Sequence, residues 1–307
     1  MIVVSSGKKY LDIDGVACAI AYQELLTLQG EEAIAVFSAP LNQSVTPLAR
    51  KHGLPYQTTC PENTNEFVVV DVSDPDHFDP CVKREAVIEI FDHHAGFEIF
   101  WQEKLHEHAH IKMIGACATL IYEAYEKLGF VSRMSVRAAN LLAIAIVSNT
   151  VSFKVPITSP RDHEAYEALL LHGDLPEAWI EQYFEEQNQL ILKDISNATK
   201  DDTKIEAIPE LDHPLIFGQL EFWNADTFLA HHLEEAKKAL LSYDSPYWMF
   251  LVHDISKGIS TIITEDDKIK NLLEKKLGVL FNGNTCKTKN IILRKIVLKS
   301  LRETYAF

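Results

Sequence analysis

The sequence has little of what marks several classes of protein. Glycine and proline contribute 12 residues each out of 307, too few for a fibrous or low-complexity chain. Lysine and arginine total 29 against 44 acidic residues, and the resulting net charge of −15 argues against broad binding to nucleic acid or anionic membranes. The longest apolar run, residues 138–147, is about half of the roughly 20 residues that a membrane span needs. These shortages leave a folded, acidic protein with any basic binding site confined to a local pocket.

Cysteine is also scarce. The five cysteines are odd in number and widely spaced, and no Cys-x-x-Cys occurs, which excludes a disulfide framework and a zinc ribbon. They are Cys18, Cys60, Cys81, Cys117 and Cys286. The first 15 residues contain only a short apolar run, so we expect no signal peptide. Together these features predict a reducing, cytoplasmic location.

The residues that are present indicate an α/β fold of two domains. A length of 307 residues with 47% apolar and 24% charged residues suits two domains better than one. In the first half, a helical stretch at 15–29 lies between two β-branched runs, and this alternation predicts a parallel sheet with helices on both faces. The strands expected there are 2–5, 33–37, 67–71 and 87–91.

The pattern changes twice further along. After residue 92 it becomes helical, and the helices expected are 117–127, 136–147, 161–171 and 176–198. From residue 203 strands return, at 204–207, 215–220, 248–253 and 260–264. We place the domain boundary near the end of the last helix, giving domains 1–190 and 191–307.

Acidic and histidine residues follow several predicted strands. Asp12 and Asp14 come shortly after the first strand, Asp71 ends the third, and Asp92-His93-His94 ends the fourth. Because ligands bind at the carboxyl edge of a parallel sheet, these side chains are expected to converge there. Asp12 or Asp14 alone could instead cap the following helix, and Asp71 could cap its strand. Jointly, oxygen and imidazole donors favour a Mn²⁺ or Mg²⁺ site.

Two other clusters have simpler interpretations. His106, His108 and His110 alternate, as on the metal-binding face of a strand, but flanking glutamates favour a solvated strand or loop. The segment from 281 onward is basic. Its residues 294–302 are explained by a solvated amphipathic helix, whereas residues 281–290 form a plausible anion-binding loop.

The order of these motifs resembles the DHH phosphoesterase superfamily, and specifically the family II (manganese-dependent) inorganic pyrophosphatases and their exopolyphosphatase relatives. The similarity covers nearly the whole chain and is most specific at Asp92-His93-His94. The other matching segments are 7–14, 71–73, 115–119, 148–158, 202–204, 218–221, 253–255 and 283–290.

The resemblance implies a fold and a set of site residues. The fold is an N-terminal parallel-sheet DHH domain and a smaller, mixed-sheet DHHA2-like domain, with the active site in a cleft between them. The implied metal ligands are Asp12, Asp14, Asp71, His93 and Asn149, with Asp71 also counted as catalytic. The groups that hold or protonate the phosphate are His94, Lys204, Lys287 and Lys289. The implied cofactor is Mn²⁺ or Mg²⁺, the implied substrate is a small phosphorylated molecule, and a homodimer is an expected assembly.

Departures from the family pattern leave two functions open. Lys8 stands where the family has a metal-binding histidine, Asn149 replaces an aspartate, and Lys287-Thr288 replaces Arg-Lys. The first hypothesis is a phosphohydrolase that splits a phosphoanhydride with metal-activated water, binding one ion tightly. The alternative is a catalytically impaired phosphate-binding protein in which the Lys8 ammonium replaces an ion beside Asp12 or Asp71.

Overall fold

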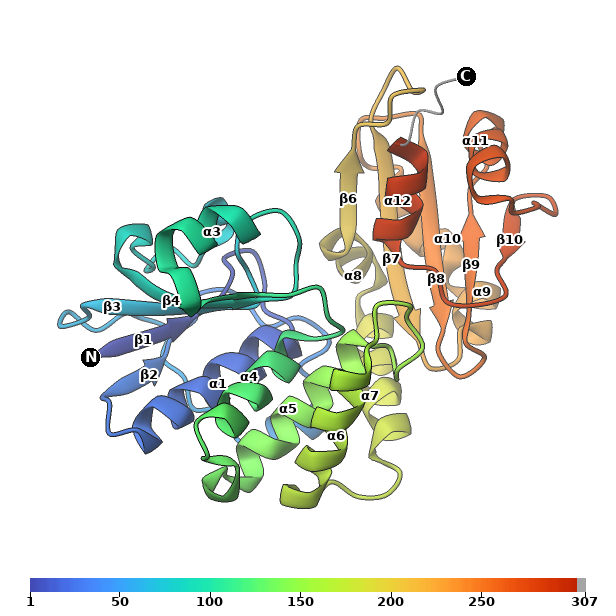
Figure 1. Ribbon diagram of the computed structural model, residues 1–307. Coiled ribbons are helices and arrows are strands. Elements are labelled where there is room, and N and C mark those ends of the chain that lie inside the picture. The colour runs from blue at the N-terminus through green and yellow to red at the C-terminus, as the bar shows by residue number, and fades with distance from the viewer. Residues whose placement is uncertain (303–307) are drawn as a thin grey trace. The chain divides into compact units, whose positions relative to one another are not determined.

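The computed structural model describes residues 1–302, and within them the chain divides into two compact units (Figure 1). The first unit comprises residues 1–153 and 157–183, and the second begins at Phe184 and also includes Lys154–Pro156. Among the described residues, no helix is both long and apolar enough to cross a membrane.

The first unit is built on a five-stranded parallel sheet in the order β2-β1-β3-β4-β5. Its strands are β1 (Ile2–Ser5), β2 (Ala33–Ala35), β3 (Glu66–Val70), β4 (Val87–Asp92) and β5 (Ala109–Ile111). The α/β prediction is therefore confirmed. The edge strand β5 is missing from the sequence prediction, because its three residues include a histidine and no long apolar run.

Helices cover both faces of this sheet, with α3 on one face and α1 and α4 on the other (Figure 1). The apolar run at 138–147 lies within helix α5, and every residue of that run is buried, including its one polar residue, Asn140, whose side chain is hydrogen-bonded to Asp174. The helices of this unit are α1 (Ile13–Leu28), α2 (Pro47–Arg50), α3 (Glu98–Leu105), α4 (Cys117–Lys127), α5 (Val136–Asn149) and α6 (Pro160–His172). Short 3₁₀ turns occupy Pro75–His77, Arg84–Ala86, His106–His108 and Val131–Arg133.

The second unit contains a mixed five-stranded sheet in the order β10-β9-β8-β7-β6, in which only β7 and β8 run parallel. The strands are β6 (Thr203–Glu206), β7 (Leu215–Phe222), β8 (Trp248–Asp254), β9 (Ile259–Ile263) and β10 (Thr285–Lys287). One apolar cluster joins one face to α8 (Ile195–Asp201), α9 (Asp226–His231) and α10 (Leu233–Leu240). A second joins the other face to α11 (Asp267–Leu277) and α12 (Arg294–Arg302).

The long helix predicted at 176–198 is two helices. Helix α7 (Trp179–Lys193) ends at Lys193, and the Asp194 side chain then accepts the backbone N–H of Asn197 as the N-cap of α8. The two units part inside α7, between Tyr183 and Phe184. The predicted boundary at residue 190 falls in the same helix.

Candidate metal centre

Asp71 ends β3 in an unusual conformation. Its φ is 60°, in the left-handed region that few non-glycine residues adopt, and its N–H donates to the Phe91 carbonyl of β4 at 2.8 Å. The side chain is 8% exposed, and its Oδ1 is buried and accepts no hydrogen bond from the described residues. A buried carboxylate oxygen without a donor needs a cation or a proton to be stable.

The start of α1 brings two more carboxylates to this point. Asp12 is the N-cap of α1 and accepts the N–H of Gly15 at 3.0 Å, so the capping interpretation holds for this residue. A Cβ on Gly15 would lie 2.9 Å from Ser6 Oγ and 3.5 Å from Asp71 Oδ2. Glycine at this position therefore lets α1 begin directly against Asp71.

Asp14 is completely buried and joins α1 to the beginning of α4. Its carboxylate accepts the backbone N–H groups of Cys117 at 2.8 Å and Ala118 at 2.9 Å. Burial raises the pKa of Asp14, and the nearby His93 together with these two N–H groups offsets the rise only in part. The Cys18 thiol also donates to Oδ1 at 3.3 Å, so Asp14 is held rigidly and Oδ2 is the oxygen that keeps a second lone pair.

His93 follows β4 and is oriented by the loop before α4. Its Nδ1 lies 3.1 Å from the Ile114 carbonyl, which can only accept, so Nδ1 carries the proton. Its Nε2 then faces Asp71 Oδ1 at 3.4 Å and Asp14 Oδ2 at 3.8 Å. A backbone carbonyl fixing one ring nitrogen while the other faces carboxylates is the usual arrangement of a metal-binding histidine.

His94 points outward, with 63% of its side chain exposed. Its Nδ1 is 2.8 Å from Asp92 Oδ1, which also accepts the N–H groups of His93 at 2.7 Å and His94 at 3.1 Å. Burial alone would raise the pKa of Asp92, but the hydrogen bond and charge of His94 outweigh it and lower that pKa. Asp92 therefore holds the His94 ring in place at the exposed side of the cluster.

These side chains form a small acidic cluster that suits a cation. One donor atom each from Asp71, His93 and His94 lies within 4.8 Å of the others. Burial, followed by the charges of Asp12 and Asp14, raises the pKa of Asp71 well above its ordinary value. A divalent cation would remove this repulsion, and oxygen and imidazole donors fit Mn²⁺ or Mg²⁺.

Two other predicted residues of the first unit, Lys8 and Asn149, form no side-chain hydrogen bond or ion pair with the cluster in the part of the chain that the structure describes. The prediction that Lys8 places its ammonium beside Asp12 or Asp71 is wrong, because its side chain is exposed and forms no ion pair within the described chain. The backbone is the cause, since Gly7 pairs with Phe78 and the Lys8 N–H donates to the His77 carbonyl at 2.9 Å.

Asn149 is the last residue of α5, and its side chain is half-buried. It makes no hydrogen bond within residues 1–302, whereas its neighbour Ser148 accepts the Tyr183 hydroxyl at 2.8 Å. The carboxamide of Asn149 therefore has both its oxygen and its nitrogen available.

In the second unit, Lys204 and Lys287 lie on the two edge strands. Lys204 pairs with Phe217 across β6 and β7, and Lys287 pairs with Thr261 across β10 and β9. Following the register across the sheet places the two side chains on opposite faces, with four strand spacings, about 19 Å, between the edges. Lys289 follows β10 and is exposed. The register does not favour direct contact of Lys204 and Lys287 with one phosphate.

Arg294 is the cation that the sequence analysis missed. It was assigned to a solvated helix face, but its side chain is only 13% exposed and is paired with Asp202. Its guanidinium also donates to the Asp202 carbonyl at 2.7 Å. The sequence does not reveal that Arg294 is buried and paired with Asp202, because buried and solvated arginines look alike in a basic amphipathic segment.

Comparison with known proteins gives relatives over the whole chain. A probable manganese-dependent inorganic pyrophosphatase of Clostridium acetobutylicum is 25% identical over 315 aligned positions, covering 96% of this chain and 94% of that protein. The crystal structure of a putative family II inorganic pyrophosphatase from Methanococcus jannaschii superposes with a TM-score of 0.65 at 22% identity, covering 99% of this chain and all of that one. An exopolyphosphatase-related protein from Bacteroides fragilis superposes with a TM-score of 0.52 at 12% identity, covering 97% of this chain and 89% of that one.

No family model matches the sequence. The resemblance therefore depends on full-length relatives of low identity, on a shared fold, and on an intact Asp92-His93-His94 at the end of β4. In sequence and in fold, the chain resembles the DHH phosphoesterases, and among them the family II, manganese-dependent inorganic pyrophosphatases.

Proposed function

We propose that this protein is a divalent-metal-dependent phosphohydrolase that splits a phosphoanhydride, either pyrophosphate or a short polyphosphate. The observation that carries the proposal is Asp71 Oδ1, a buried carboxylate oxygen with no hydrogen bond that faces Nε2 of His93. Relatives named manganese-dependent inorganic pyrophosphatases support this activity and support Mn²⁺ as the cofactor.

Asp71 and His93 would hold the cation, with Asp14 behind them and Asp12 beside them. The donor set fits, because it combines carboxylate oxygens with an imidazole nitrogen and includes no thiolate. A bound divalent cation supplies positive charge to phosphate oxygens and makes a water molecule more acidic. Asn149 is a further oxygen donor at the end of α5.

The chain's own groups would handle the proton and the phosphate charge. The His94 side chain is exposed while Asp92 orients its ring, which suits proton donation to a leaving phosphate oxygen. Lys204 would bind the far phosphate as a point charge. Lys287 and Lys289 are the alternative cations for that phosphate, because the register places Lys287 at the other edge and on the other face of the same sheet.

The non-catalytic alternative loses its main support. It required the Lys8 ammonium to occupy an ion position, whereas the Lys8 side chain is exposed and makes no ion pair with the cluster in the described chain. Its second support, Asn149 in place of an aspartate, removes a negative charge but keeps an oxygen donor at the end of α5.

The direct test is release of orthophosphate from pyrophosphate and from tripolyphosphate, with Mn²⁺, with Mg²⁺ and with excess chelator. The proposal predicts turnover that requires metal and is lost in His93→Gln. If the metal-loaded protein binds imidodiphosphate by calorimetry but releases no phosphate from either substrate, the hydrolase proposal fails and the binding alternative stands.

A further inference from the structure

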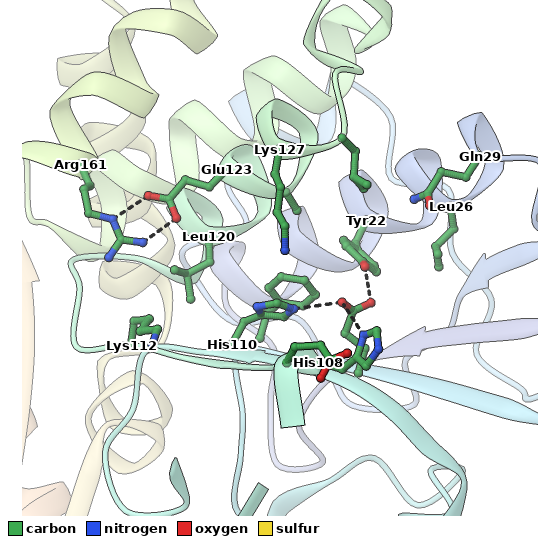
Figure 2. Close-up of a pocket in the computed structure, with 15 residues that line it drawn as sticks. Tyr22, Leu26, Gln29, His108, His110, Lys112, Leu120, Glu123, Lys127 and Arg161 are labelled. Carbon is green, nitrogen blue, oxygen red and sulfur yellow. Dashed lines mark hydrogen bonds and ion pairs between the residues drawn. The ribbon is translucent and has the colours of Figure 1, made fainter. Parts of the chain in front are cut away.

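The first unit contains a pocket that shares no residue with the acidic cluster. Its cavity is about 360 Å³, in the range of small-molecule sites. It opens between the β4–β5 edge of the sheet and the C-terminal halves of α1 and α4 (Figure 2). Its apolar lining includes Leu26, Phe91, Leu120, Ala124 and Leu128.

A carboxylate lies at the inner wall of this pocket. Glu89 is 17% exposed, accepts the Tyr22 hydroxyl, and lies 3.0 Å from His110 Nε2 and 3.7 Å from His108 Nδ1 (Figure 2). His110 is therefore not the solvated residue that the sequence favoured, and its ring stacks on Phe91 with centroids 4.4 Å apart. Each oxygen of Glu89 can accept another hydrogen bond from a ligand.

The pocket also carries two lysines that form no ion pair with the described residues. Lys127 reaches from α4 toward the centre of the pocket, and Lys112 follows β5 on the sheet side (Figure 2). Neither forms an ion pair within the described chain, whereas the lining residue Arg161 is paired with Glu123 at 2.5 and 2.6 Å. Glu107, at the exposed rim, is the remaining acidic group.

From this juxtaposition we infer that the pocket binds a small organic anion with a flat aromatic body that carries an N–H donor. The body would lie on the apolar lining, its N–H would donate to Glu89, and its phosphate or carboxylate would pair with Lys127 and Lys112. Inorganic phosphate alone would bind poorly, because Glu89 repels it and it cannot cover the apolar lining. The pocket is thus a ligand site separate from the phosphohydrolase centre.

The test is calorimetry on the full chain in chelator, with adenosine 5′-monophosphate as the probe and adenosine and inorganic phosphate as its two halves. We expect one site, with binding at least tenfold tighter for the monophosphate than for either half. Indole-3-acetate, an aromatic carboxylate with an N–H donor, is the second probe. Its binding would indicate a general aromatic-anion site, whereas binding of the monophosphate alone would indicate a nucleotide site. Binding of either probe supports the inference. Absence of binding by both overturns it.

Variants locate the binding. Lys127→Met should lower the affinity for the monophosphate at least fivefold. Lys83→Met, at an exposed lysine of the same unit outside the pocket, should leave that affinity unchanged. Asp71→Asn should also bind normally, which separates this site from the metal centre. The inference is overturned if Lys127→Met binds like the unmodified chain, or if Asp71→Asn removes binding. Both lysines are exposed, so their loss leaves the fold intact.

Discussion

At the scale of single residues, the acidic cluster holds buried carboxylates that repel one another, and a bound cation would remove that repulsion. Asp71 has a positive φ and a buried carboxylate with neighbouring carboxylates at Asp12 and Asp14. Each of these features costs stability, and none improves packing. The sequence position at a strand end and the unpaired oxygen therefore have a common explanation in metal binding.

Asp71→Asn should separate stability from function. Burial and the neighbouring carboxylates raise the pKa of Asp71, so its charged form is unfavourable in the metal-free fold, and the neutral amide should raise the free energy of unfolding. Mn²⁺ affinity and phosphate release should both fall at least tenfold. Urea denaturation, metal titration and a phosphate assay measure the three quantities. Asp76→Asn, at an exposed aspartate nearby, is the control, and a loss of stability in Asp71→Asn would contradict this account.

His94→Gln tests the proposed proton donor. Because His94 is held by Asp92 and directed to solvent, its replacement should lower kcat about 10²-fold while Mn²⁺ affinity stays unchanged. Steady-state kinetics and metal titration are the measurements. A comparable loss of Mn²⁺ affinity would show that His94 is a metal ligand instead.

At the scale of elements, β7 and β8 carry polar side chains onto one face of the second sheet. Glu221 pairs in register with His253, whose Nδ1 lies 2.8 Å from Ser260 Oγ. Burial, followed by the Asp202 charge, raises the pKa of Glu221 from 4.5 to about 7, and Arg294 offsets this only in part. Burial lowers the pKa of His253 to about 3, so that ring is neutral.

Glu221 should make stability depend on pH in a defined direction. Its pKa is higher in the folded state, so the folded protein holds the proton more tightly and loses stability as pH rises from about 4.5 through about 7. Glu221→Gln should reduce the loss between pH 5 and pH 8, as measured by urea denaturation at both values. Glu235→Gln, at an exposed position of α10, should retain it. Equal pH dependence in the two variants would refute the assignment.

The sequence predicted the apolar elements well and the short polar ones poorly. Strands β1, β3, β4, β7, β8 and β9 are rich in apolar or β-branched residues, and each lies close to the position that the sequence predicts. Strands β5 and β10 have three residues each and exist because a neighbouring strand supplies their hydrogen bonds, which no local pattern reports.

The site was predictable to the same degree. Strand ends gave Asp71 and His93, because topology alone brings the carboxyl ends of parallel strands to one edge. The Lys8 side chain points to solvent because of the pairing of Gly7 with Phe78. The burial of Arg294 depends on its ion pair with Asp202, 92 residues earlier in the chain. Both are tertiary contacts that a single sequence does not encode locally.

At the scale of the whole molecule, a protein of net charge −15 must attract an anionic substrate through local cations. Lys204→Met should weaken imidodiphosphate binding several-fold in calorimetry with Mn²⁺, and more at low salt than at high salt. Lys287→Met is the matched comparison, because the register places that residue at the other edge and on the other face of the sheet. Unchanged binding in both variants at both salt concentrations would contradict a phosphate-binding role for the second unit.

The central claim is that Asp71 and His93 form a metal centre, and anomalous diffraction at the manganese edge from crystals grown with Mn²⁺ tests it most directly. We predict one strong peak in bonding contact with Asp71 Oδ1 and His93 Nε2. Two full peaks separated by about 3.5–4 Å would keep the centre but contradict the single tight ion. A map without a peak at these two atoms would contradict the account itself.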